Sequence, residues 1–378
     1  MQLPVSPRLV RGLFLCMSCL FAQNLGARVW TPPSDDTPVL ELEPRPAPIN
    51  AAADSWPMER ALTAAEAHLE QLRRSGNPRH YEAIQLLTQP WLETPSAAPV
   101  LLARAQQHQH RFDAALQILQ QHPTDTQHQA EAALLEAAIL RLLGHYSNAL
   151  QACERIRANS PERLLCEWPV RSLTGELDAA IHQLTQLRPA QLDSTLSRWR
   201  HSELAEMHER AGKDEAALRH WLSALQFDSR DPFIATATAD LLIRTGRADT
   251  ALQVLEPLPS LDPVLIRRTQ AARSLGRGDA DKLAEQIWQR LQLADQVHGK
   301  AHPRELTQTA LILGRDQEAL EWARRNWTLQ KEPMDARLLV IAAHAAGQPD
   351  GAAVVRRWQQ ETGLQDVRLS DMPSGDQP

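Results

Sequence analysis

The sequence has little of what a β-sheet or a broadly basic surface needs. Phe, Trp and Tyr make up only 4% of its 378 residues. Alternating runs of β-branched residues are scarce, so no strand is expected. Lysine occurs at only four positions, and the formal net charge is −6. A chain with this charge offers no broad basic face, which argues against nucleic acid as its main partner.

Catalytic and metal-binding motifs are also missing. The sequence contains no P-loop, no Rossmann glycine fingerprint, no nucleophile elbow and no H-E-x-x-H. No Cys or cluster of carboxylates completes a tetrahedral metal site around any of the suggestive histidine pairs. These pairs are His108 with His110, His201 with His208, and His298 with His302. We therefore expect no metal site, no cofactor and no enzymatic activity.

The N-terminus has the parts of an export signal. Arg8 and Arg11 precede an apolar run at 13–22, and small residues follow at 26 and 27. A transmembrane helix needs roughly 20 apolar residues, about twice the length of this run. We expect residues 1–27 to be a cleaved secretory signal and the protein to be exported to the periplasm or cell envelope. Cys16 and Cys19 lack the preceding residues of a lipoprotein signal, so attachment to a membrane through a lipidated or uncleaved N-terminus is not favoured.

Two segments outside the repeats lack the composition of a packed core. Prolines at 32, 33, 38, 44, 46 and 48 stand among acidic and small residues, which predicts a disordered tether at 28–56. The last residues are polar and contain Pro and Gly, so 364–378 is expected to be a flexible tail.

Between these segments the chain repeats itself with a period of about 34 residues. The repeat is marked by a position that is glycine in eight of nine cases and His110 in the ninth. Five residues after this position stands alanine in seven cases, far more often than chance predicts. The nine marking positions are Gly76, His110, Gly144, Gly175, Gly212, Gly246, Gly276, Gly314 and Gly347.

Each feature of the repeat has a steric reason. A glycine just past a helix end takes the left-handed conformation that closes a turn without a Cβ clash. Small residues at fixed offsets, such as Ala205 and Ala217 on either side of Gly212, let two helices cross closely. Large apolar residues then fill the space between successive helix pairs. Prolines near the ends of the second helices, such as Pro161 and Pro263, are expected to close them.

These features together resemble the tetratricopeptide repeat (TPR) family. The segments GHYSNALQACERIRANSP, GKDEAALRHWLSALQFDSRDP and GRDQEALEWARRNWTLQKEP fit best. The resemblance covers residues 57–363. It implies an all-α, right-handed superhelical solenoid of about nine antiparallel helix pairs, in which the first helices line a concave groove.

Two cysteines remain after removal of the signal. The repeat register places Cys153 and Cys166 on adjacent helices, and an oxidising compartment would allow them to pair. Two buried, unpaired thiols are the alternative, because Cys is among the most often buried residues.

The resemblance to the TPR family also implies which side chains point into the groove. An aromatic residue beside paired charges in two adjacent repeats suits an extended peptide. The alternative is that the aromatic residues pack at repeat junctions and that the charges form a solvated face. The candidate partner-binding residues are Trp199, Glu206 and Arg210 in one repeat and Phe233, Asp240 and Arg244 in the next.

The sequence thus predicts a non-catalytic scaffold that binds a protein or peptide. Ten tryptophans against two tyrosines leave a second function open, a glycan-binding accessory factor of an envelope assembly or secretion system, because exposed indoles stack on sugar rings. An enzyme with a buried metal is a third and weaker alternative.

Overall fold

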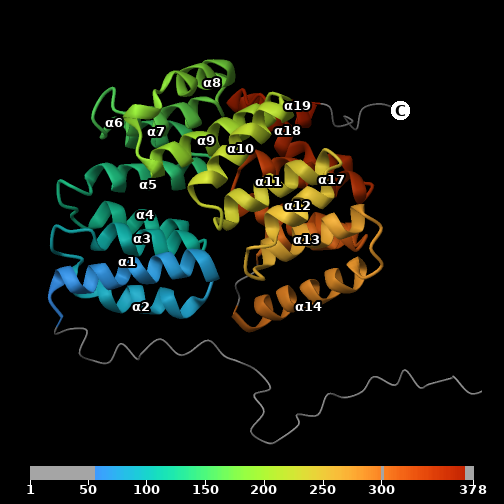
Figure 1. Cartoon of the computed structure of the whole chain (residues 1–378), viewed down its shortest axis with the longest axis horizontal. Helices are drawn as coiled ribbons and strands as arrows, with labels where there is room; N and C mark the ends of the chain where they lie inside the picture. Colours follow the sequence, from blue (N-terminus) through green and yellow to red (C-terminus); the bar gives the residue numbers. More distant parts are fainter. Residues whose placement is uncertain (1–55, 299–301, 371–378) are drawn as a thin grey trace, which may run out of the picture. The chain divides into compact units, whose positions relative to one another are not determined.

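A computed structural model describes residues 56–298 and 302–370 (Figure 1). The predicted secretory signal, all but the last residue of the predicted tether, and residues 371–378 lie outside this part. Within the described residues the chain is helical and contains no strand. None of the described helices is both long and apolar enough to cross a membrane.

The helices form nine consecutive pairs, as the sequence predicted, and a short helix follows the last pair. The first five pairs are α1 (Met58–Ser75) with α2 (Pro78–Thr88), α3 (Ala98–His108) with α4 (Phe112–Gln121), α5 (Gln129–Leu142) with α6 (Tyr146–Glu154), α7 (Pro161–Arg171) with α8 (Leu177–Gln186), and α9 (Ser194–Arg210) with α10 (Asp214–Phe227). The other four are α11 (Pro232–Arg244) with α12 (Ala248–Leu255), α13 (Asp262–Ser274) with α14 (Ala280–His298), α15 (Pro303–Ile312) with α16 (Asp316–Leu329), and α17 (Pro333–Ala345) with α18 (Ala353–Thr362), after which comes α19 (Val367–Ser370).

The turns and crossings inside the pairs follow the steric logic of the repeat. All nine marking positions have positive φ, and this includes His110 at 53°. The seven alanines five residues later are 0 or 1% exposed, because each lies where the two helices of a pair cross. The pair around Gly276 lacks that alanine, and the buried Ala280 stands one residue earlier instead.

The prolines between pairs have a different place from the one that the sequence suggested. Pro161, Pro232 and Pro333 are the first residues of α7, α11 and α17, so they begin the next pair and do not end the previous one. The reason is that the first turn of a helix has no intrahelical partner for its N–H groups, and proline lacks this group.

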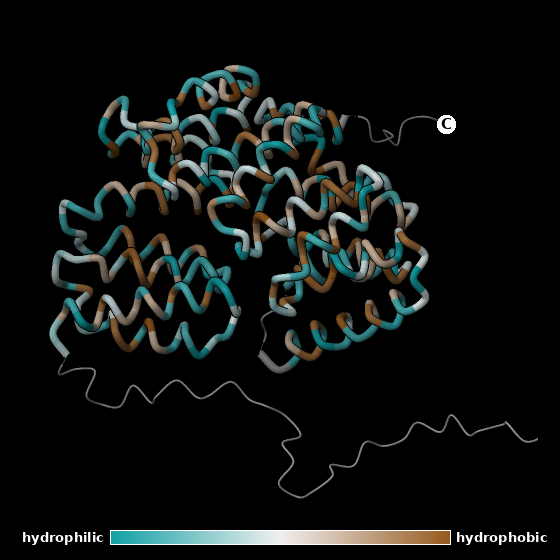
Figure 2. The backbone as a smooth tube through the Cα atoms, viewed as in Figure 1, coloured by the Kyte–Doolittle hydropathy of each residue, from teal (hydrophilic) through white to brown (hydrophobic). Residues whose placement is uncertain are grey.

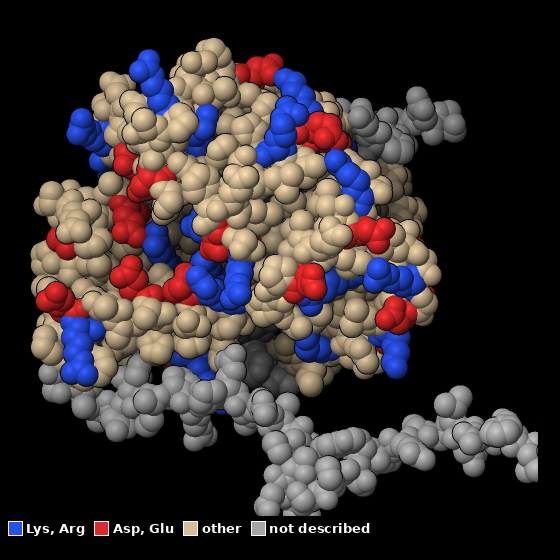
Figure 3. Space-filling model, viewed as in Figure 1, with Lys and Arg blue, Asp and Glu red and all other residues tan. Residues whose placement is uncertain are grey.

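Successive pairs stack so that the first helices contact one another. Helices α11, α13, α15 and α17 form one such row, and α1, α3, α5, α7 and α9 form another. Each helix carries apolar residues on one side, visible as recurring brown segments in Figure 2. On the face shown in Figure 3, charges of both signs are interspersed and do not gather in one patch.

The row of pairs winds until later pairs contact earlier ones. The contacting residues are 155 to 188 positions apart, which corresponds to about five repeats of 34 residues. One superhelical turn therefore takes about five pairs. The contacts are those of Arg73 with Asp228 (2.9 Å) and Asp231 (2.7 Å), of the Leu177 N–H with Gln365 Oε1 (3.1 Å), and of Arg368 with Glu209 (2.9 Å).

The packed structure extends beyond residue 363, where the sequence predicted that a flexible tail begins. Leu364 and Leu369 are buried, and Asp366 forms an ion pair with Arg337 of α17. Segment 363–370 stays in place because it covers the turns at Gly175 and Gly212. Its apolar residues are too few to form a repeat, so a repeat pattern does not reveal them.

Candidate functional site

A cavity of about 960 Å³ lies between the first helices of the second superhelical turn. Helices α9, α11, α13, α15 and α17 supply its walls, together with Trp221 of α10 and Arg368 of α19. This volume is at the upper end of the range of small-molecule sites. The cavity therefore has room for a larger ligand, such as a segment of peptide.

Apolar side chains form much of the cavity wall. Phe233 of α11 is 54% exposed and Ile341 of α17 is 45% exposed, although both belong to residue types that are usually buried. Leu311 and Met334 line the same space. Behind Phe233 lies the buried ring of Trp221, in an edge-to-face contact with 6.1 Å between the ring centres.

The carboxylate of Glu209 joins three elements at the wall. Its Oε1 accepts a hydrogen bond from Trp221 Nε1 (2.8 Å), and its Oε2 accepts from Arg244 (3.2 Å) and Arg368 (2.9 Å). Arg244 also pairs with Asp214 (2.7 Å). This carboxylate therefore holds α9, α10, α11 and α19 together and has little capacity left for a ligand.

Two further carboxylates of the lining are also paired. Glu332 accepts a hydrogen bond from Arg304 Nη2 at 2.6 Å, and Arg304 also forms an ion pair with the buried Asp335 (2.8 Å). Asp240 accepts two hydrogen bonds from the buried Arg267 (3.0 and 2.8 Å). These pairs fix the positions of α11, α13, α15 and α17 around the cavity.

Arg210 is a buried cation without a carboxylate in hydrogen-bonding distance. Its two terminal nitrogens donate to the carbonyl oxygen (2.7 Å) and the hydroxyl (2.6 Å) of Ser172, on the preceding helix pair. Burial lowers the pKa of Arg210 to about 10. The side chain thus connects α9 to the end of α7 and remains charged at neutral pH.

Glu206 differs from the other acidic residues of the lining. No hydrogen bond or ion pair joins its carboxyl group to any described residue. Burial, with the nearby carboxylates of Glu203 and Glu332, raises its pKa to about 8, even though Arg141 and Arg210 act in the opposite direction. Glu206 also lines a second cavity of about 20 Å³, so it lies where the two cavities meet.

The structure brings five of the six predicted groove residues together at this cavity. Glu206, Arg210, Phe233, Asp240 and Arg244 all line it. Trp199 does not, because its indole N–H donates to Glu203 (2.9 Å) and its ring packs in the apolar cluster between α7, α8 and α9.

Most of the remaining lining residues were not predicted, although a signal for several of them exists. The six predicted residues stand 13, 6 or 2 positions before the marking glycine of their repeat. The same offsets, applied to the three following repeats, select further residues that line the cavity. These residues are Gln270 and Ser274 on α13, Gln308 and Ile312 on α15, and Met334 and Ile341 on α17. Arg368 carries no such signal, since it lies outside the repeats.

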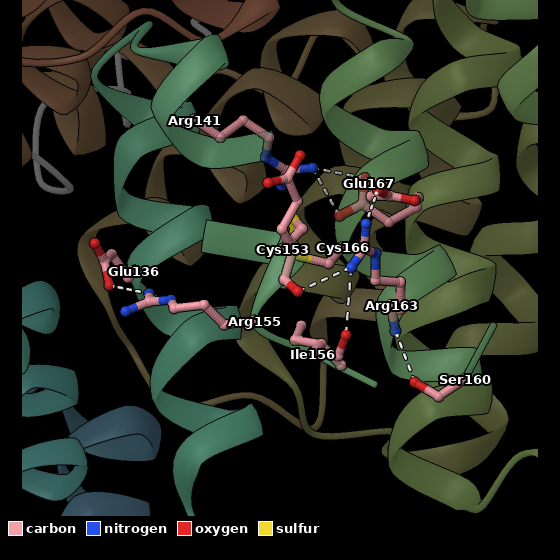
Figure 4. Close-up of a disulfide and its surroundings, with 11 residues drawn as sticks. Glu136, Arg141, Cys153, Arg155, Ile156, Ser160, Arg163, Cys166 and Glu167 are labelled. Carbon is pink, nitrogen blue, oxygen red and sulfur yellow. Dashed lines mark hydrogen bonds and ion pairs between the residues drawn. A yellow bond between two sulfur atoms is a disulfide. The ribbon is translucent and has the colours of Figure 1, made fainter. Parts of the chain in front are cut away.

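Cys153 of α6 and Cys166 of α7 are joined in a disulfide (Figure 4). Both residues are buried. Nearby, Arg163 donates to the carbonyl oxygens of Glu154 (3.0 Å) and Ile156 (3.3 Å), which fixes the turn between the two helices. Neither cysteine lines the cavity.

Four histidines of the suggestive sequence pairs make ring contacts, but with other histidines than those that the sequence paired them with. His201 and His220 are linked by their Nδ1 atoms (3.0 Å), and His208 stacks on His220. His110 and His302 are in edge-to-face contact. Over residues 56–298 and 302–370, no three His, Cys, Asp or Glu side chains are grouped so that they could hold a metal ion.

Comparison with known proteins gives similarity to solved structures alone. The sequence matches no protein-family model and no curated protein. Among solved structures, the chain is similar to the human IFIT1 dimer with PPP-AAAA, with 14% sequence identity and a TM-score of 0.39. The match covers 75% of this chain and 68% of the IFIT1 chain. A similarity this distant has no bearing on what the present chain binds.

Proposed function

We propose that the protein is a non-catalytic scaffold that binds a peptide segment of another protein in the cavity between its first helices. The observation that carries this proposal is the exposure of Phe233 and Ile341 inside a cavity whose charged residues are mostly paired with one another. Exposed apolar side chains in a concave site are the usual anchors for apolar side chains of a ligand.

The ion pairs at the cavity wall support binding in preference to catalysis. A general acid or base must be free to exchange a proton with a substrate. Glu209, Asp240 and Glu332 each accept hydrogen bonds from arginine instead. Such pairs keep the wall rigid, which lowers the entropy that an incoming peptide must lose on binding.

The lining also favours a peptide over a glycan. Sugar rings stack on exposed indole faces, but Trp221, the one tryptophan among the described lining residues, is 1% exposed and donates its N–H to Glu209. Phe233 and Ile341 instead offer surfaces suited to aliphatic and aromatic side chains.

An exported location remains part of this proposal. The disulfide between Cys153 and Cys166 supports it, because disulfides persist in oxidising compartments and are rare in the cytosol. The periplasm or cell envelope is the compartment that we propose.

A displayed library of random 12-residue peptides, panned against the purified chain, tests the proposal. We expect enriched peptides with apolar residues, and we expect Phe233→Ala and Ile341→Ala to weaken their binding at least tenfold. The reason is that each substitution removes an apolar contact worth about 1.5–3 kcal/mol. Affinities are measured by fluorescence anisotropy with labelled peptides.

Leu222→Ala is the matched control, because Leu222 of α10 is 43% exposed and lies outside the cavity lining. Circular dichroism verifies that all variants are folded. The proposal is wrong if no peptide is enriched, or if Leu222→Ala weakens binding as much as Ile341→Ala. The glycan alternative would be supported if the protein bound to a glycan array and if the bound glycan, added in solution, quenched the tryptophan fluorescence of the protein.

A further inference from the structure

We infer that the peptide carries a lysine or arginine side chain that forms an ion pair with Glu206. This inference rests on the proposed function and adds the chemistry of one contact. It follows from which charged groups around the cavity are already paired within the protein.

The basic residues of the lining offer little to an anionic ligand. Arg244, Arg304 and Arg368 each pair with carboxylates at 2.6–3.2 Å. Arg337 pairs with Asp366, and Arg210 donates to Ser172. Arg273 is half exposed at the cavity rim, where water screens its charge.

The groups that face Glu206 are likewise engaged with other partners. On α9 itself, Glu203 accepts two hydrogen bonds from Arg141 of α5 (both 2.9 Å). Glu332, at the start of α17, accepts from Arg304 (2.6 Å). Lys331 also lines the small cavity, but it forms no ion pair with Glu206. Arg141 and Arg210 attract Glu206 only at longer range. Glu206 is therefore the acidic group of the inner lining to which no described cation donates a hydrogen bond or forms an ion pair.

A cationic side chain satisfies this site better than the alternatives. An ionised carboxylate without a partner is costly in a partly dry cavity, and an approaching ammonium or guanidinium removes that cost. An anion would meet arginines that already pair with carboxylates or, in the case of Arg210, already donate to Ser172. The apolar surfaces of Phe233 and Ile341 would hold the neighbouring side chains of the same peptide.

Binding is expected to release a proton. In the free protein, burial and the carboxylates of Glu203 and Glu332 raise the pKa of Glu206 to about 8, so the group is mostly neutral at pH 7. A bound cation favours the ionised form and lowers this pKa. At pH 9 the carboxyl group of Glu206 is already ionised in the free protein, so binding no longer has to remove its proton. The affinity for a basic peptide should therefore rise about tenfold between pH 7 and pH 9.

The peptide library provides the test, with the full chain as wild type, as Glu206→Gln and as Glu215→Gln. Glu215 is the matched control because its side chain is 72% exposed on α10, outside the cavity lining. We expect the wild type and Glu215→Gln to enrich Lys or Arg next to apolar residues. Glu206→Gln should keep the apolar preference and lose the basic one, because glutamine preserves the shape of the side chain without its charge.

A double-mutant cycle then isolates the contact. In the strongest binding peptide, replacing the selected Lys or Arg by norleucine should weaken binding to the wild type at least tenfold. The same replacement should change binding to Glu206→Gln less than twofold. Affinities of the basic peptide at pH 7 and pH 9 give the proton linkage, which should vanish in Glu206→Gln.

The two proposals fail in different ways. If no peptide is enriched, the proposed function is wrong. If peptides bind and depend on Phe233, but show no basic preference or keep that preference with Glu206→Gln, the proposed function stands and this inference is overturned. Enrichment of Asp or Glu would also overturn it, because the cavity would then recognise anions through its arginines.

Discussion

The ring of His220 lies between the rings of His201 and His208, on the helix pair that also supplies Glu206 and Arg210. Its Nδ1 atom shares a hydrogen bond with that of His201 (3.0 Å), so only one of the two atoms carries a proton. A second proton would place two N–H groups against each other. Burial, followed by the neighbouring His201 and His208, accordingly lowers the pKa of His220 to about 4.

This pKa predicts that the protein loses stability in mild acid. Between pH 6.5 and pH 4 the unfolded chain binds a proton at His220 that the folded chain does not, so the free energy of unfolding falls as the pH falls. His220→Gln should reduce the loss by roughly 1 kcal/mol, since water partly screens this ring. Urea titrations at pH 7 and pH 4.5 measure the difference.

The exposed His145 provides the control for this comparison. His145→Gln should leave the difference between the two pH values unchanged. Equal pH dependence in the wild type and in His220→Gln would show that the ring cluster does not contribute.

At the scale of elements, the helix pair is the unit that the sequence specifies. The marking glycines and the alanines that follow them predicted all nine pairs, because both requirements are local to one turn and one crossing. The groove positions predicted from the repeat register also placed Phe233 and Asp240 at the cavity. The position of Trp199 could not be predicted in this way, because Glu203, one helical turn further on, holds its indole by a hydrogen bond.

What the repeat does not specify is how far the pairs wind. The contacts of Arg73 with Asp228 and of Arg368 with Glu209 join residues more than 150 positions apart. They depend on small rotations between neighbouring pairs, which add up along the chain. A pattern read over one period contains no measure of that sum, and so the contacts between superhelical turns and the packed segment 363–370 were not predicted.

The link between α6 and α7 gives a prediction at this scale. The disulfide of Cys153 and Cys166 closes a short loop with a sequence separation of 13, and such a loop contributes roughly 3 kcal/mol to the free energy of unfolding. Reduction with dithiothreitol should therefore lower the melting temperature by about 5 °C. Calorimetry of the oxidised and reduced protein measures the shift.

The variant with both cysteines replaced by alanine controls for other effects of the reductant. Its melting temperature should be low and should not respond to dithiothreitol. A wild type that melts at the same temperature in both redox states, with reduction verified by mass spectrometry, would contradict the prediction.

At the scale of the whole helical unit, the marking glycines fall into two groups. A Cβ atom at Gly76, Gly144, Gly175 or Gly212 would meet residues of the following superhelical turn, whereas at Gly246, Gly276, Gly314 and Gly347 it would meet nothing within 4 Å. At the positions of the first group, a larger residue would be disfavoured both by the positive φ and by contact with the following superhelical turn. This group lies where one turn of the superhelix rests on the next.

Alanine substitutions in the two groups test this closure. Gly212 and Gly246 have similar φ values, +71° and +77°, so alanine at either costs about 1 kcal/mol in backbone strain. At Gly212 the new methyl group would also lie 3.1 Å from Val367 of α19. We expect Gly212→Ala to cost about 1 kcal/mol more than Gly246→Ala, and trypsin to cleave at Arg368 faster in that variant. Equal stability and equal cleavage of the two variants would show that α19 does not rest on this turn.

In an open array of repeats, the terminal repeats can melt while the middle stays folded, because each repeat depends only on its neighbours. Arg73 attaches the first pair to the loop between α10 and α11, and Gln365 and Arg368 attach the last segment to α8 and α9. The first helix pair and segment 363–370 therefore cannot detach without breaking their contacts with the central helix pairs. These contacts couple the ends of the array to its centre, so we expect the helix pairs to unfold more cooperatively than those of an open array.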